Sequence, residues 1–168
     1  RPHSKRSKSR KDKILMLNVT YHDNASKHDF LLDSGASSHM SCESTWLHNL
    51  HPIPSREIRL ADNSMIHADA AGDLVLEAPS HKNTALKLTI KDVLFVPKLG
   101  LNLLSSSRLA EKGVTSVFDK HVCALIDTQN NNDIIARANL RDNLYWISDM
   151  VVTPVPENAT PVSSENMS

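Results

Sequence analysis

The stretch LLDSGASSHM, which runs from Leu31 to Met40, carries two leucines directly into an aspartate. The chain then turns small and polar, through a serine, a glycine, an alanine and two more serines. A surface loop can have this composition by chance. A hydrophobic strand that delivers a carboxylate into a tight turn of small residues is also the shape that carboxylate-based hydrolysis requires. The rest of the sequence decides between these two interpretations.

Hydrolysis of a peptide by carboxylates uses two aspartates that share one proton, because two ionised carboxylates a few ångströms apart repel each other. Such a pair titrates as a unit. Asp33, Ser34 and Gly35 have the composition of one half of that site: Asp33 carries the carboxylate, the Ser34 hydroxyl can bond to the backbone of the other half, and Gly35 lets that backbone approach. On its own, Asp-Ser-Gly is a weak motif.

A second half is not found in the chain. Asp127-Thr128-Gln129 follows an apolar strand in the same manner, but it lacks the glycine. Residues 114–150 are also too few to form a second lobe that resembles the first. The remaining arrangement is a symmetric dimer in which each chain gives one Asp33.

Alternation of apolar and polar residues between residues 27 and 150 predicts a mostly β domain, a small barrel or a sandwich. One helix is predicted at 106–112, with Gly113 as its C-terminal cap, and a shorter helical turn is expected over 43–50, before Pro52. Cys123 and Trp146 fall in apolar strand contexts and are expected in the core. The expected strands are 57–61, 64–70, 73–78, 86–96, 114–118, 121–126, 133–137 and 143–147.

Both ends of the chain differ in composition from this domain. The first thirteen of the 168 residues hold seven Lys or Arg and one acid, although the formal net charge of the whole chain is zero. Residues 1–26 are expected to be a basic disordered linker, and residues 151–168 a polar disordered tail. The alternative for residues 1–13 is a weak contact with RNA or a nuclear-import signal.

Several classes of protein are disfavoured by composition. No apolar window is long enough for a membrane span, and no secretory leader is visible, so no membrane contact is expected. The two cysteines do not make a disulfide framework, which favours a reducing compartment.

A zinc site competes with the carboxylate interpretation. His39, Cys42, His48 and His51 form a His-x2-Cys-x5-His-x2-His array of good zinc ligands. The five residues between the two pairs are fewer than most zinc-finger loops contain, so surface histidines beside a small buried cysteine are the plainer interpretation. No metal or cofactor is therefore expected.

Four blocks in this order, LLDSGASSHM, IRLADNSMIHADAAGDLVL, IKDVLFVPKLGLNLLSSSRLAEKG and DNLYWI, resemble the protease region of copia-type LTR retrotransposon Gag-Pol polyproteins. The resemblance spans residues 30–147. It implies a shortened relative of retroviral proteases: a small closed β-barrel, active as a homodimer, with Asp33 catalytic, Ser34 bracing the pair of aspartates and Gly35 shaping the turn. Leu103-Leu104-Ser105 corresponds to the apolar-apolar-Gly strand that backs the active-site loop, with a serine that copia-type sequences commonly share.

The same resemblance assigns the hairpin at Ala61, Asp62, Asn63 and Ser64 to the flap that closes over substrate. A flap offers backbone groups to an extended peptide, which binds as an added strand. This flap has no glycine at its tip, but Asn63 tolerates a left-handed turn conformation. The plain alternative is a surface β-turn with no part in catalysis.

The function expected from the resemblance is that of an aspartic endopeptidase, a homodimer that cleaves the Gag-Pol precursor with water activated by two Asp33 side chains. Its expected location is the cytoplasm, within virus-like particles, or the nucleus. The alternative is a catalytically inactive β-barrel that serves as an interaction or dimerisation module. A binding module for a metal or a nucleic acid is the third interpretation.

Overall fold

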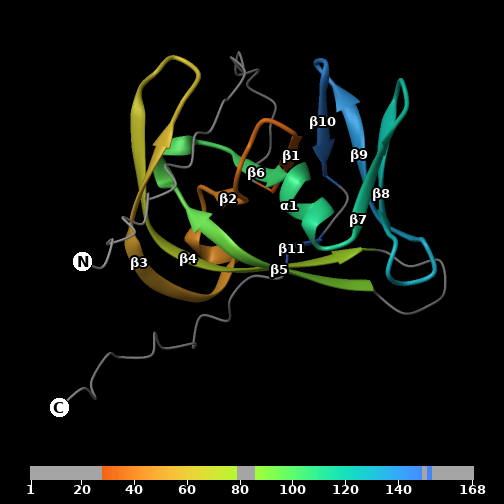
Figure 1. Cartoon of the computed structure of the whole chain (residues 1–168), viewed down its shortest axis with the longest axis horizontal. Helices are drawn as coiled ribbons and strands as arrows, with labels where there is room; N and C mark the ends of the chain where they lie inside the picture. Colours follow the sequence, from red (N-terminus) through yellow and green to blue (C-terminus); the bar gives the residue numbers. More distant parts are fainter. Residues whose placement is uncertain (1–27, 79–85, 149–150, 153–168) are drawn as a thin grey trace, which may run out of the picture.

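The computed structural model describes residues 28–78, 86–148 and 151–152 as a β-rich domain (Figure 1). The mostly β class is confirmed, and so is the single α-helix, α1 (Ser106–Glu111). Two short 3-10 helices, η1 (Ser44–Trp46) and η2 (Pro97–Leu99), complete the helical part of the described residues. The strands are β1 (Phe30–Asp33), β2 (Met40–Ser41), β3 (Leu47–Arg59), β4 (Met65–Ala78), β5 (Leu86–Phe95), β6 (Asn102–Ser105), β7 (Val114–Phe118), β8 (Val122–Asp127), β9 (Asp133–Arg141), β10 (Leu144–Ile147) and β11 (Val151–Val152).

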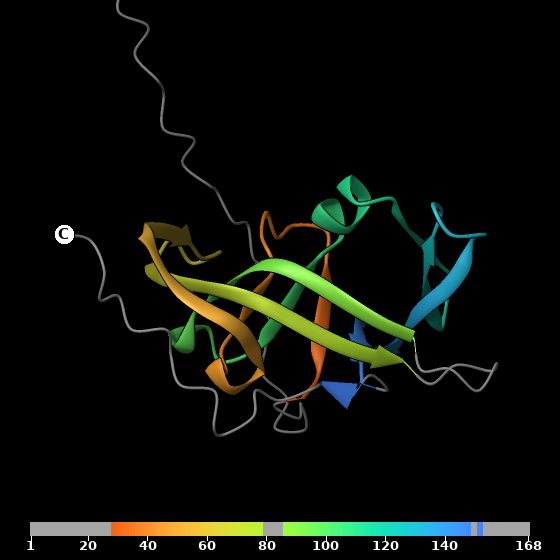
Figure 2. The ribbon, with the colours of Figure 1, turned by 90° about the horizontal axis from the view of Figure 1, so that it is seen from below.

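The strands form one sheet that follows the order β11-β4-β5-β2-β6-β1-β10-β9-β8-β7, with β3 paired to β4 beside this path. Long, curved β3, β4 and β5 lie on one side, and the β7–β10 ribbon stands on the other (Figures 1 and 2). Among the described residues no ladder joins β7 back to β3, β4, β5 or β11, so the prediction of a closed barrel is wrong. The reason is that the chain leaves β6 through α1, and this helix, rather than a strand, lies between β5 and β7.

The two central strands, β1 and β6, are buried on both faces. Phe30 and Leu32 of β1 enter one hydrophobic core with Leu104 of β6, whereas Leu31 and Leu103 enter a second core on the opposite face. Because a strand with two buried faces needs apolar residues at every position, it has a continuous apolar run rather than an alternating pattern. This explains why three apolar residues in succession lead to Asp33. Cys123 and Trp146 are buried, as expected from the sequence.

The segment around 43–50 differs from its predicted helical turn. Only η1 is helical, and β3 starts at Leu47 and continues through Pro52 and Pro54. Proline cannot donate a hydrogen bond to a ladder, so within sheets it is tolerated at edges and bulges. Among the described strands β3 pairs only with β4, and its register shifts between His48 and His51 and again between Pro52 and Arg56.

The boundaries predicted for the two tails lie largely outside the described residues. Within the described part, Val151 and Val152 pair with Glu77 and Leu76 of β4, just beyond the predicted end of the domain at residue 150. No helix in the described ranges is both long and apolar enough to cross a membrane.

Gly72 provides a test of the packing between β3 and β4. A Cβ atom at this position would lie 2.8 Å from the His48 carbonyl oxygen and 3.0 Å from the Leu47 Cβ, so the backbone of β3 would have to move. We expect Gly72→Ala to lower the free energy of unfolding by about 1–3 kcal/mol, the usual cost of overpacking. Urea unfolding measures this change. Asp69→Ala, at an exposed position of the same strand, is the control and should change stability much less.

Candidate functional site

Asp33 lies at the point where the central strand pair ends. β1 runs parallel to β6 with Leu31 opposite Leu103, Leu32 opposite Leu104 and Asp33 opposite Ser105. The Asp33 side chain is half-buried, and its Oδ1 accepts the backbone N–H of Gly35 at 2.7 Å, which closes a local turn. Ser34 and Gly35 are exposed. The sheet therefore presents one carboxylate at the mouth of a tight, accessible turn.

Ser105 ties this turn to α1. Its fully buried hydroxyl donates to the Ala36 carbonyl at 2.6 Å and accepts the Arg108 backbone N–H at 3.3 Å, so that Ser105 is the N-cap of α1. The Ser107 hydroxyl lies 3.0 Å away. A glycine at position 105 would have none of these contacts. The serine therefore gives the turn a hydrogen-bonded support that a glycine could not supply.

His39 and Arg108 hold the far side of the same loop. The Ser105 backbone N–H donates to Nδ1 of the buried His39 at 3.1 Å, and Arg108 Nε donates to the Ser37 carbonyl at 3.0 Å. Arg108 also forms a 3.0 Å ion pair with Glu111. Burial lowers the pKa of His39 to about 4; the Arg108 charge acts in the same direction, and Glu111 opposes it. The imidazole is consequently neutral at pH 7, as an acceptor at Nδ1 must be.

The start of β1 is anchored by buried polar groups. Asn102 Nδ2 donates to the Asp29 carbonyl at 3.2 Å, and its Oδ1 accepts the Ser41 hydroxyl at 2.9 Å. The buried Asp29 carboxylate forms a 2.7 Å ion pair with Arg141. The Arg141 guanidinium lies 4.9 Å from the centroid of the Trp146 ring. β1, β2, β6 and β9 are thereby fixed relative to one another.

The predicted flap is the exposed end of the β3–β4 hairpin, comprising Ala61, Asp62, Asn63 and Ser64. Asn63 has φ of +65°, the left-handed conformation that this residue was expected to tolerate. Asp62 Oδ1 accepts both the backbone N–H of Ser64 at 2.9 Å and its hydroxyl at 2.6 Å, and these bonds lower the pKa of Asp62. In Figure 1 this end of the hairpin lies at the same edge of the domain as the loop after β1. Closure over a substrate stays a prediction.

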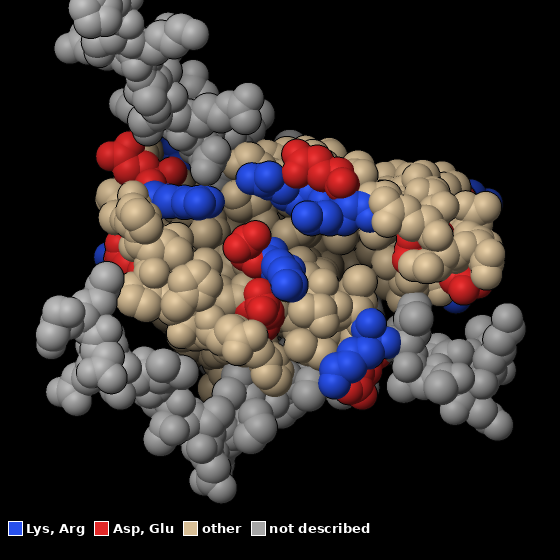
Figure 3. All heavy atoms as spheres, turned by 60° about the horizontal axis from the view of Figure 1, so that its bottom comes forward, with Lys and Arg blue, Asp and Glu red and all other residues tan. Residues whose placement is uncertain are grey.

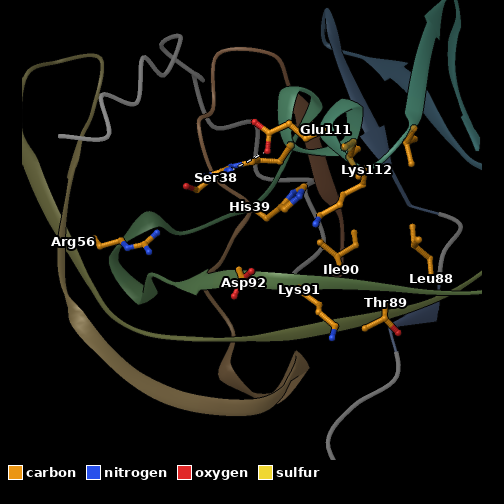
Figure 4. A pocket seen from close by; sticks show the side chains of 13 residues that line it. Ser38, His39, Arg56, Leu88, Thr89, Ile90, Lys91, Asp92, Glu111 and Lys112 are labelled. Atoms are coloured by element: carbon orange, nitrogen blue, oxygen red, sulfur yellow. Dashed lines mark hydrogen bonds and ion pairs between the residues drawn. The ribbon is translucent and has the colours of Figure 1, made fainter. Parts of the chain in front are cut away.

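Two pockets flank the loop that follows Asp33. The larger, of about 550 Å³, lies between β5 and α1 (Figure 4) and is called the β5 groove below. It is lined by residues 88–92 of β5, by Arg108, Leu109, Glu111, Lys112 and Val114, and by Ser38, His39 and Arg56. The smaller pocket, of about 460 Å³, lies between α1 and β7 and is lined by Ser34 together with Ser106, Ser107, Thr115, Ser116 and Thr128, among others. Asp33 itself lines neither.

The zinc array predicted as an alternative is not assembled. Within the described ranges no three His, Cys, Asp or Glu side chains are grouped as metal ligands. His39 bonds to Ser105, and Nδ1 of the exposed His51 lies 2.9 Å from the Asn49 carbonyl. The plainer interpretation is also wrong in part, because His39 is buried and Cys42 is half-buried. Asp127 is a turn residue: its carboxylate accepts the Gln129 N–H and the Asn130 amide.

The described residues thus form a β-rich domain in which a parallel apolar strand backs an Asp-Ser-Gly turn. The chain belongs to the family described as Pol polyprotein, beta-barrel domain, whose model matches residues 30–114. It is 28% identical over 124 residues to the Transposon Ty1-BR Gag-Pol polyprotein of Saccharomyces cerevisiae, and 27% identical over the same length to the Ty1-DR4 and Ty1-NL2 Gag-Pol polyproteins of that yeast. The resemblance to copia-type retrotransposon polyproteins is thus confirmed.

The match covers 74% of this chain but only 6–7% of those polyproteins, so the chain spans a small part of their length. No solved structure matches the chain.

Sequence reasoning missed the roles of His39 and Arg108. From the sequence, His39 was expected to be a zinc ligand or a surface residue. Arg108 was expected only as part of a helix. Their proximity to the loop after Asp33 depends on hydrogen bonds between residues that lie 66 and 71 positions apart in the chain. Local sequence patterns do not report contacts at such separations.

The lowered pKa of His39 predicts a pH dependence of stability. The unfolded chain takes up a proton at this side chain below about pH 6.5, whereas the folded chain does so only below about pH 4. The free energy of unfolding should therefore fall as pH drops through this window, by on the order of 3 kcal/mol from this group. His39→Asn keeps an acceptor but removes the titration, so urea unfolding between pH 7 and pH 4 should show a shallower fall for this variant. His67→Asn, at an exposed histidine of β4, should retain the wild-type slope.

Proposed function

We propose that the domain is one half of an aspartic endopeptidase that acts on a Gag-Pol polyprotein. The observation that carries this proposal is the position of Asp33, a half-exposed carboxylate fixed at the end of a strand that is buried on both faces. The turn after it is rigidly supported by Ser105 and Arg108 and remains open to solvent at Ser34 and Gly35. The names of the Ty1 relatives, all Gag-Pol polyproteins, indicate the substrate class.

In the proposed mechanism two copies of the chain bring their Asp33 carboxylates together. One carboxylate is protonated and polarises the scissile carbonyl, while the other accepts a proton from the attacking water. The Gly35–Asp33 hydrogen bond holds each carboxylate against its own turn. Each chain contributes one such group, so the site is incomplete in a single copy.

A surface suited to this dimer adjoins the Asp33 turn. β7 is the last strand of the sheet path and pairs only with β8 among the described strands, which leaves its second edge open. Its Val117 and Phe118 side chains are both 50% exposed, and open edges with apolar side chains are the usual sites of strand pairing. Thr115 and Ser116 at the start of β7 share the smaller pocket with Ser34. A two-fold axis beside this strand would therefore pass close to both turns.

The β3–β4 hairpin is the proposed lid. It reaches the same edge of the domain as the Asp33 loop, and its end has no buried side chain from residue 61 to residue 65. Such an end can move without disturbing either core. An extended substrate would then lie between hairpin and turn, hydrogen-bonded to backbone groups.

The central test replaces the proposed catalytic group. Asp33→Asn preserves the acceptor for the Gly35 N–H but cannot ionise, so cleavage of a polyprotein that contains this region should fall by at least about 10³-fold with an unchanged circular dichroism spectrum. Asp142→Asn is the matched control, because Asp142 is exposed and its φ of +53° suits asparagine equally well. Cleavage by the Asp33→Asn protein at the wild-type rate would refute the assignment.

The dimer has its own test. Mixed dimers of wild-type and Asp33→Asn chains hold one ionisable carboxylate and should be inactive. A ninefold excess of Asp33→Asn chains, after equilibration, should thus lower activity per wild-type chain about tenfold by random pairing. The same excess of Asp142→Asn should not lower it. If the activity per wild-type chain does not change when Asp33→Asn chains are added, a single chain is sufficient for cleavage.

A further inference from the structure

The β5 groove has a strand edge as its floor. On one side β5 pairs with β4 from Leu86 to Phe95, whereas on the other it meets β2 only at Leu94 and Phe95. From Lys87 to Val93 this second edge has no strand beside it in the described part of the chain. Residues 88–92, five in succession, line the groove, so the groove runs along this edge of β5. Open edges of this kind accept an additional strand.

The walls of the groove confine what could enter. Figure 4 shows α1 above β5, with His39 and Lys112 between them and Arg56 toward the β3–β4 hairpin. Leu88, Ile90 and Leu109 give it an apolar lining. Its volume of about 550 Å³ lies within the range of protein clefts that hold ligands. Its course along β5 suits an extended chain better than a compact small molecule.

The charges of the groove select the chemistry of its occupant. Four basic side chains line it, Arg56, Lys91, Arg108 and Lys112, against the acidic Asp92 and Glu111. Arg108 is already engaged by Glu111 and the Ser37 carbonyl. Arg56, Lys91 and Lys112 make no ion pair with any described residue. In Figure 3 basic side chains lie on both sides of a hollow across the middle of one face.

We propose that the β5 groove binds an extended acidic segment of a second polypeptide, which adds as a strand to the open edge of β5. Backbone hydrogen bonds to β5 would supply register, and Arg56, Lys91 and Lys112 would select carboxylates. The basic first thirteen residues of the chain itself have the wrong charge for this site. The groove does not include Asp33, so the inference is independent of the proposed proteolysis.

The experiment measures fluorescence polarisation of a labelled nine-residue peptide, in which glutamate alternates with valine or threonine, on the full chain carrying Asp33→Asn. The peptide should bind this protein as well as it binds the wild type, so a failed protease assignment leaves the result intact. Replacing its glutamates by lysine should abolish binding. Methylating alternate backbone nitrogens should weaken it at least about tenfold, because strand pairing needs these donors while charge attraction does not.

Matched variants locate the site. Lys91→Glu should weaken binding about tenfold or more, whereas Lys98→Glu, an equal charge change at an exposed position outside the groove, should change it little. Hydrogen exchange should show new protection at residues 87–93.

Several outcomes would overturn the proposal. They are no binding at about 1 mM peptide, equal binding of the N-methylated peptide, equal loss from the two lysine variants, and protection at β7 instead of β5. Dissociation of a dimer by the peptide would also overturn it, because the groove would then be an interface between copies of this chain.

Discussion

The parallel pairing of β1 with β6 is the constraint on which the rest of the structure depends. Both strands are buried on both faces, and each sends alternate side chains into two separate cores. A shift of one residue in β6 would exchange its two sets of side chains between the cores and place Asn102 or Ser105 among apolar residues. Asp33 is therefore positioned by the packing of Phe30, Leu31 and Leu32, with no freedom to slide along the sheet.

Polar groups at the two ends of the β1–β6 pair fix the neighbouring segments by hydrogen bonds and so give the site its shape. At the start, Asn102 joins Asp29 to Ser41, and Asp29 binds Arg141. At the end, Ser105 joins the Ala36 carbonyl, the His39 imidazole and the first turn of α1. Apart from the half-buried Arg141, each of these side chains is buried and hydrogen-bonded, so the loss of one acceptor would leave a donor unsatisfied. The exposed Ser34 and Gly35 lie outside this set of buried polar groups, which holds the segments on either side of them.

The sequence predicted the local features and missed those set by distant contacts. β7 was predicted at its observed bounds, 114–118, and Asn63 was expected to tolerate the left-handed conformation that it adopts, because alternation and turn chemistry are local. β3 was missed over Pro52 and Pro54, since prolines disfavour a strand unless it lies at an edge with bulges. The sheet does not close because of the place where α1 packs. The periodicity of apolar residues does not specify that place. His39 was misjudged because its environment comes from residues 105 and 108, and the Asp29–Arg141 pair joins residues 112 apart.

The hydrogen bonds of Ser105 make α1 and the turn after β1 a single cooperative unit. A helix of six residues is too short to be stable alone, so α1 persists through its cap and its contacts with the loop. If α1 frays, the Ser37 carbonyl loses its Arg108 donor and the Ser105 hydroxyl loses the Arg108 N–H, so the part of the support of the Asp33 turn that comes from the helix is lost. Most of the buried side chains of the two cores come from strands, and Leu109 is the one that α1 contributes, so the greater part of both cores would survive this opening. On heating, the turn should therefore become disordered, reversibly, at temperatures where the sheet is still intact.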